Sequence, residues 1–194
     1  MAVTNVLIVG VGGQGVLLAG TLLSKIALDA GLDVKQSEVH GMSQRGGSVS
    51  SHVRFGERVY SSLIEDGTVD VLLAFEKLEA LRYSHTIRKK KGVALVNDQR
   101  IDPSPVAIGA AEYPEDRIFP ELSERAGKVV KVDGLGLAKE AGFAGAVNVV
   151  LLGAASRFLP FTDEQWAETI RSTVKEKYVD INLKAFELGK GSDG

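Results

Sequence analysis

A short polar segment early in the chain carries several groups that can bind an anion. It supplies an imidazole, an amide, a guanidinium, hydroxyls and glycine backbone: His40, Gly41, Met42, Ser43, Gln44, Arg45, Gly46, Gly47 and Ser48. Arg45 can hold a carboxylate or phosphate through two parallel hydrogen bonds, and Gln44 and Ser48 can add neutral ones. Loops this rich in adaptable polar groups often carry function, so the segment predicts an anion-binding surface. The alternative is a solvated surface turn.

A second candidate lies nearer the N-terminus, where the apolar residues 6–9 run into a cluster of glycines. Three of these glycines have the spacing G-x-G-x-x-G, which in a dinucleotide site makes the turn and lets backbone approach a pyrophosphate. The candidates for contact with a phosphate or other anion are Gly10, Gly12, Gly13, Gln14 and Gly15. We expect that anion at the N-terminus of the following helix. The alternative is that the glycines serve only close packing of helix on strand.

A dinucleotide enzyme also needs an acidic residue at the end of its second strand to hold the ribose. Glu38 is close to that place, but it opens a long glycine-rich segment instead of a tight turn. A free-standing Rossmann-type oxidoreductase, dependent on NAD(P) or a flavin and using Gly10–Gly15 with Glu38, is one alternative function. An interaction module whose glycine turn binds nothing is another.

Other polar residues point less clearly to chemistry. His52 shares the even-numbered side of a strand with Ser50 and Arg54, so we expect it to be exposed. Asn148 lies in an apolar helix, where a buried amide commonly bonds neighbouring backbone but can also face a site. No Ser–His–Asp set or paired-carboxylate spacing is evident. The chain is expected to bind without a catalytic set of its own.

These candidates need an α/β scaffold to position them. The first half predicts strands at 3–9, 33–39 and 48–55, with a helix at 14–30. A turn at Gly56 and Glu57 predicts a return strand through residues 58–64, and hence an inserted antiparallel hairpin.

The second half predicts buried strands at 70–75, 92–97 and 128–133, a helix at 76–90 and a short strand at 106–108. The basic run 88–91 would end the helix at 76–90. Beyond residue 135 the chain predicts helices, one opened by a capping box at Thr162–Gln165 and one running from 179 until Gly189. Gly142, Gly145 and Gly153 would allow close helix approach.

The predicted fold class is therefore α/β. It is a single Rossmann-like domain over residues 1–189, with a mostly parallel sheet, an inserted antiparallel hairpin and helices at the C-terminus. Residues 190–194 are expected to form a mobile tail.

Composition removes several classes of function. The 194 residues are 44% hydrophobic and 25% charged, with a net charge of −2, which gives no general attraction to nucleic acid or membrane. There is no cysteine, so this chain alone binds no iron–sulfur cluster, and three histidines make a metal site improbable. No membrane span or signal peptide is evident, so we expect a cytoplasmic protein.

Three segments together resemble a known family. Gly10–Val16, Glu38–Val49 and Asn182–Gly189 occur in the order and at the separations found in the gamma-type subunit of 2-oxoacid:ferredoxin oxidoreductases. The form of Glu38–Gly47 most resembles the beta subunit of indolepyruvate:ferredoxin oxidoreductase. The resemblance covers the chain from Val6 to Gly189.

The resemblance implies a subunit that is inactive alone. In that family a large partner, the alpha subunit, carries thiamine diphosphate, Mg²⁺ and [4Fe-4S] clusters, and the complex reduces ferredoxin. The complex oxidatively decarboxylates a 2-oxoacid, here an indolepyruvate or other arylpyruvate, with coenzyme A as co-substrate to give acyl-CoA. The resemblance also implies that the His40–Ser48 loop faces the partner's active site, with Gln44 and Arg45 as anion contacts.

Overall fold

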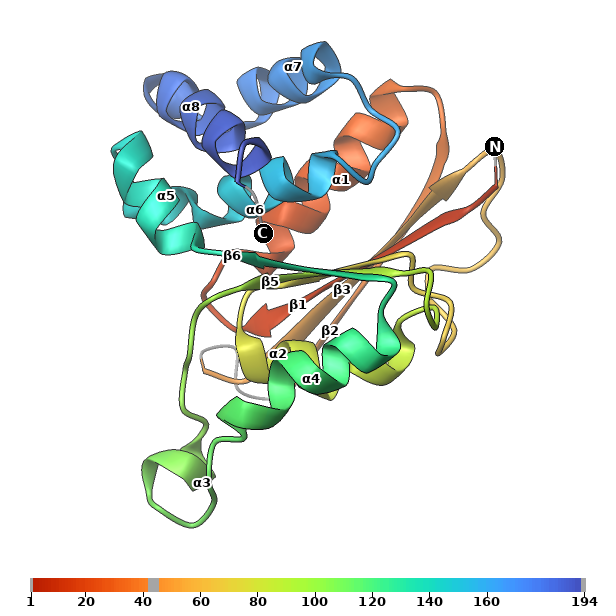
Figure 1. The fold of residues 1–194 in the computed structure, drawn as a ribbon. Helices are drawn as coiled ribbons and strands as arrows, with labels where there is room; N and C mark the ends of the chain where they lie inside the picture. The colour runs from red at the N-terminus through yellow and green to blue at the C-terminus, as the bar shows by residue number, and fades with distance from the viewer. Residues whose placement is uncertain (1, 42–45, 193–194) are drawn as a thin grey trace.

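The computed structural model describes residues 2–41 and 46–192. Within these residues, six strands form one mixed sheet in the order β2-β3-β1-β4-β5-β6 (Figure 1). The strands are β1 (Thr4–Val11), β2 (Asp33–His40), β3 (Ser48–Gly56), β4 (Val71–Ala74), β5 (Val93–Asn97) and β6 (Lys128–Val132). β1, β4, β5 and β6 pair in parallel, whereas β3 is antiparallel to both β1 and β2. The predicted α/β class with a mostly parallel sheet is confirmed.

Helices cover the two faces of the sheet unequally. One face carries α1 (Val16–Asp29), α5 (Gly134–Ala141), α6 (Val147–Ser156), α7 (Asp163–Thr173) and α8 (Val179–Lys190). The other carries α2 (Lys77–Arg82) and α4 (Glu115–Arg125). The short α3 (Ser104–Ala107) lies away from both, and 3-10 turns occupy Ser84–Thr86, Ala144–Ala146 and Glu176–Tyr178. β1 and β4 are buried almost throughout because helices cover both their faces.

The inserted hairpin differs from the prediction. β2 and β3 form it, joined by residues 41–47, and the strand expected at 58–64 is wrong. Since β2 and β1 occupy both edges of β3, no edge remains for a further strand. Residues 58–64 instead cross the face of β3, where Arg54 Nη1 donates to the carbonyls of Ser61 and Leu63 at 3.0 Å.

Three further predictions need correction. The helix expected at 76–90 stops at Arg82, and the basic run 88–91 forms a turn before β5 rather than a helix end. The short strand expected at 106–108 is wrong, because α3 and a turn occupy this region. The capping box is confirmed, with the Thr162 hydroxyl accepting from the Gln165 amide and the Gln165 side chain accepting from the Thr162 amide.

Close packing of α6 and α8 confirms one of the glycine predictions. A Cβ at Gly153 would lie 2.1 Å from the carbonyl oxygen of Phe186. Gly189 lies within α8 instead of ending it, because the helix runs to Lys190. A Cβ at Gly189 would overlap the carbonyl of Val150, so this glycine also allows the close packing of α6 and α8. Gly142 serves differently, as the left-handed residue that ends α5.

Among the described residues, no helix combines the length and apolar character needed to cross a lipid bilayer.

Candidate functional site

The glycine turn lies between β1 and α1, at the carboxyl end of the parallel strands. Gly13 and Gly15 have φ of 104° and 90°, a region that favours glycine. A Cβ at Gly10 would meet Phe75 Cβ at 2.8 Å and Val16 Cγ2 at 2.9 Å. These positions therefore need glycine for the turn and for the close approach of α1 to the sheet.

The Gln14 side chain ties this turn to the neighbouring chain segments. Its Oε1 accepts from the Val11 amide at 2.7 Å, and its Nε2 donates to the Phe75 carbonyl at 3.0 Å and to Gln99 Oε1 at 3.1 Å. The helix after β1 covers one face of the sheet, and the helix after β4 covers the other. The glycine turn therefore lies at the topological switch point of the sheet.

The second candidate segment joins the first through backbone hydrogen bonds. The Gly12 amide donates to the Gly47 carbonyl at 2.8 Å, and the Gly46 amide donates to the Gly12 carbonyl at 3.3 Å. These bonds extend the pairing of β1 with β3 beyond Val11 and Ser48. Met42, Ser43, Gln44 and Arg45 lie outside the described residues. The tertiary structure thus brings the two glycine-rich motifs to one edge of the sheet.

Ser48 fastens the end of this segment to the other face of the sheet. Its hydroxyl donates to Glu79 Oε2 at 2.5 Å, and Glu79 also accepts from Arg82 at 2.7 Å. The Glu79 side chain is almost fully buried, and this burial raises the pKa of its carboxyl group. Ser48 was expected to contact an anion, and the anion that its hydroxyl meets here is the Glu79 carboxylate.

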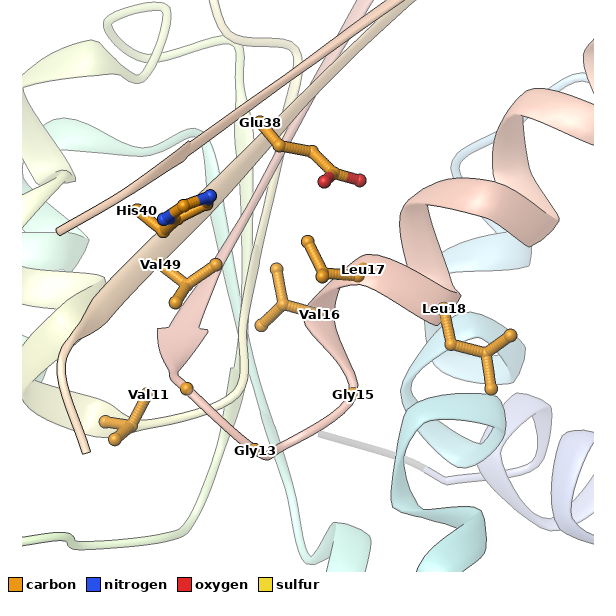
Figure 2. A pocket seen from close by; sticks show the side chains of 10 residues that line it. Val11, Gly13, Gly15, Val16, Leu17, Leu18, Glu38, His40 and Val49 are labelled. Atoms are coloured by element: carbon orange, nitrogen blue, oxygen red, sulfur yellow. The ribbon is translucent and has the colours of Figure 1, made fainter. Parts of the chain in front are cut away.

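A cavity of about 450 Å³ opens between the glycine turn and the hairpin. Figure 2 shows Glu38 and His40 of β2 on one side and Val16 and Leu17 of α1 on the other. Its full lining is Val11, Gly12, Gly13, Gly15, Val16, Leu17, Leu18, Glu38, His40 and Val49. The glycines, Glu38 and His40 were predicted from the sequence, but the apolar walls were not. The signal available for them was the apolar run at residues 16–18, of which Leu17 and Leu18 stay half-exposed.

The polar groups of this cavity come from β2. Glu38 Oε1 accepts from Gln36 Nε2 at 3.1 Å, and Gln36 Oε1 in turn accepts from the Ser24 hydroxyl of α1 at 2.7 Å. His40 is exposed, with Nδ1 at 3.3 Å from the Gly41 carbonyl. The cavity therefore combines apolar walls with one carboxylate and one imidazole at its rim.

Asn148 lies behind the glycine turn with 5% of its surface exposed. Its Oδ1 accepts from the Val149 amide at 3.0 Å, as expected for a buried amide. Its Nδ2 also lies 3.3 Å from the position of a Cβ at Gly15, so the side chain faces the turn as well. Both predicted roles of Asn148, backbone bonding and proximity to a site, meet in one residue.

His52 differs from the prediction of an exposed side chain. Residues 58–64 cover it, and its Nδ1 accepts from the Ile64 amide at 3.3 Å. Burial, with the nearby Arg54 charge as a smaller cause, lowers the pKa of the His52 imidazole. Across the described residues, no three His, Cys, Asp or Glu side chains gather in a group that could hold a metal ion.

Comparison with known proteins decides the family. Residues 5–191 match the family described as pyruvate ferredoxin/flavodoxin oxidoreductase. The chain belongs to this family. The resemblance to gamma-type subunits of 2-oxoacid:ferredoxin oxidoreductases is thereby confirmed.

Relatives cover nearly all of the chain. The indolepyruvate oxidoreductase subunit IorB of Thermococcus kodakarensis is 47% identical over 189 residues, which are 95% of this chain and 93% of that protein. IorB of Pyrococcus horikoshii is 46% identical over 189 residues, with the same two coverages. The ketoisovalerate oxidoreductase subunit VorA of Methanothermobacter marburgensis is 32% identical over 95% of this chain, but this match spans only 35% of VorA.

Solved structures give the same fold. The gamma subunit of a keto/oxoacid ferredoxin oxidoreductase from Geobacter sulfurreducens aligns with a TM-score of 0.69 and 25% identity, covering 96% of this chain and 95% of that one. A 2-oxoglutarate:ferredoxin oxidoreductase from Magnetococcus marinus, with 2-oxoglutarate, coenzyme A and succinyl-CoA bound, aligns with a TM-score of 0.74 and 22% identity. That alignment covers 98% of this chain and 31% of that chain, and it supports the fold alone.

Proposed function

We propose that the chain is a subunit of an indolepyruvate:ferredoxin oxidoreductase. The observation that carries this proposal is the 47% identity to an indolepyruvate oxidoreductase subunit over nearly the full length of both chains. The reaction consumes an arylpyruvate and coenzyme A and releases acyl-CoA and carbon dioxide. The electrons pass to ferredoxin.

The demanding chemistry belongs to a large alpha subunit in this proposal. Thiamine diphosphate with Mg²⁺, when bound there, supplies the carbanion chemistry, and [4Fe-4S] clusters carry the electrons. The donor set of this chain does not fit those groups, because it has no cysteine, and its described residues offer no metal-binding cluster. The chain thus contributes binding and orientation, and it completes an active site that the partner carries.

The His40–Ser48 loop is the proposed contact with that active site. Gly46 and Gly47 hold one end of the loop on Gly12, and Ser48 holds it on Glu79, so its base has a fixed position. Arg45 and Gln44 are proposed to bind the anionic groups of the 2-oxoacid or coenzyme A. The turn Gly10–Gly15 presents the N-terminus of α1 to the same region, where a phosphate group is favoured.

The free-standing dinucleotide enzyme has less support. The Gln14 side chain is engaged in three hydrogen bonds beside the glycine turn, and Gln36 donates to the Glu38 carboxylate that would bind a ribose. Calorimetric titration of the isolated chain with NADH and with a flavin should detect no binding in the micromolar range. Micromolar binding of either would favour the alternative.

The main test is reconstitution. The isolated chain should be colourless and should reduce no ferredoxin with indolepyruvate and coenzyme A. Addition of the purified alpha subunit should give ferredoxin reduction that depends on both substrates. Turnover by the isolated chain, or a reconstituted complex that is inactive with every arylpyruvate, would contradict the proposal.

A loop variant tests the proposed contact. Arg45→Ala should lower kcat/KM of the complex by about 10-fold or more, because one charge-assisted anion contact is lost. Arg45→Lys should retain only part of the wild-type kcat/KM, since Lys cannot bind an anion bidentately. Lys89→Ala, in the basic turn before β5, is a matched removal of positive charge. Kinetics that Arg45→Ala leaves unchanged would remove Arg45 from the site.

A further inference from the structure

Between β5 and α4 the chain leaves the body of the domain. Residues 100–112, which include α3, form an arm that projects from the carboxyl edge of the parallel strands (Figure 1). Connections of this length in a compact domain are uncommon and are often functional.

The tip of the arm is apolar and exposed. Residues 103–111 carry no charged side chain, in a protein that is 25% charged. Ile108 has 79% of its surface exposed, and Pro105, Ala107, Ala110 and Ala111 are exposed around it. Exposed apolar side chains gathered in one short segment are characteristic of a contact with another protein.

The tip is also preformed. The amides of Ala107 and Ile108 donate to the carbonyls of Pro103 and Ser104 at 3.0 and 3.1 Å. The Ala110 amide returns to the Pro105 carbonyl at 2.8 Å, which closes the tip on itself. Because its backbone is already ordered, such a segment loses little conformational freedom when it binds.

Both ends of the arm are fastened to one buried carboxylate. Glu76 Oε1 accepts from the Tyr113 hydroxyl at 2.5 Å and from the Ile101 amide at 3.2 Å, and Glu76 is only 1% exposed. The Arg100 guanidinium lies 4.3 Å above the Tyr113 ring and pairs with Asp102 at 2.6 Å. The arm therefore leaves the domain in a fixed direction.

The base of the arm is continuous with the candidate site. Gln99 Oε1 accepts from Gln14 of the glycine turn and from Asn97 of β5, each at 3.1 Å. The Gln99 carbonyl accepts from the Lys77 amide at 3.1 Å, next to Glu76. A partner that covers the glycine turn would thus stand beside the arm.

We propose that residues 103–111 are a docking arm that inserts into an apolar recess of the large alpha subunit. This inference rests on the proposed function. The match to VorA spans only 35% of that protein, so in this relative the unit is part of a much longer polypeptide. Additional protein therefore accompanies this fold in that relative, and the arm is an apolar feature that projects next to the candidate site.

The test is association of the two purified subunits, measured by titration and by sedimentation velocity. Ile108→Asp should weaken the affinity at least 10-fold, since it places a charge in an apolar contact. Leu28→Asp is the matched control, because Leu28 is 58% exposed at the far end of α1. It should bind as the wild type does. Circular dichroism of both variants should match the wild type.

The outcomes separate the two proposals. Wild-type affinity in Ile108→Asp would overturn the docking arm while leaving the oxidoreductase subunit in place. An isolated chain that dimerises through Ile108, with unchanged affinity for the alpha subunit, would also overturn it, because the occupant would be a second copy. A wild-type chain that binds no alpha subunit would overturn both proposals.

Discussion

The amide of Gly12 donates a hydrogen bond of 2.8 Å to the carbonyl of Gly47. This bond joins the glycine turn after β1 to the polar loop before β3, two segments that are separate in the sequence. Because Ser48 then bonds Glu79 on the far face of the sheet, the end of the loop is held from both sides. The candidate site is therefore a built edge of the sheet and not two independent loops.

Replacement of Gly10 tests the close approach behind this edge. Gly10→Ala should lower the free energy of unfolding by about 1–3 kcal/mol, because its Cβ would overlap Phe75 and Val16. For a chain of this size each kcal/mol lowers Tm by about 2–4 °C, which calorimetry resolves. Gly41→Ala is the control, since a Cβ there meets no described atom within 4 Å. Equal Tm values for the two variants would contradict this account.

Removal of the Ser48 hydroxyl tests the anchor on Glu79. Ser48→Ala should cost about 1.5–3 kcal/mol near neutral pH, since a hydrogen bond to a buried carboxylate is lost. Burial raises the pKa of the Glu79 carboxyl group above its ordinary value of 4.5. The stability that Glu79 contributes is therefore fully present below about pH 4.5, where the group is protonated in both the folded and the unfolded protein. This stability is lost as pH rises through the folded pKa, because the buried group must then ionise. The Ser48 hydroxyl stabilises the ionised form, so the variant should lose more stability at pH 7 than at pH 4.5 in urea titrations. Ser172→Ala, remote on α7, should show no such difference.

Tyr113 holds the base of the arm. Tyr113→Phe removes the hydroxyl that donates to Glu76 and accepts from the Leu78 amide, and should cost about 1–3 kcal/mol. Burial and then the bond to Glu76 raise the pKa of Tyr113 above its ordinary value, so the phenol stays protonated through neutral pH. Urea denaturation measures the loss. Tyr60→Phe, at a ring that is 86% exposed, should change stability by less than about 0.5 kcal/mol.

His52 predicts a pH dependence of stability. Its pKa is lowered in the folded protein, so stability is fully present above the ordinary value of 6.5 and is lost as pH falls from there to the folded pKa. The loss per pH unit cannot exceed about 1.4 kcal/mol, because a single group takes up at most one proton. Urea titrations of wild type and His52→Gln between pH 7.5 and about 5 should differ progressively in this window. Parallel curves would contradict a lowered pKa.

Local pattern was sufficient for much of the fold. The apolar runs of β1, β4 and β5 are buried on both faces, and such runs identify parallel strands without knowledge of their neighbours. The capping box at Thr162 and the glycine spacing after β1 are likewise determined within a few residues. The ordered motifs were also enough to identify the family, since they are specific in combination.

Long-range competition decided the rest. The sequence suggested that residues 58–64 pair with β3, yet β1 and β2 already occupy both its edges, and only the assembled sheet shows this. In the same way the sequence places Gln14 only in the glycine turn, and its hydrogen bonds to Phe75 and Gln99 form only because the folded chain brings these distant residues beside it. The amino-acid sequence by itself therefore determined the buried parallel strands, the glycine turn after β1 and the family. The tertiary structure decided which groups meet at the carboxyl edge, because those contacts join residues far apart in the chain.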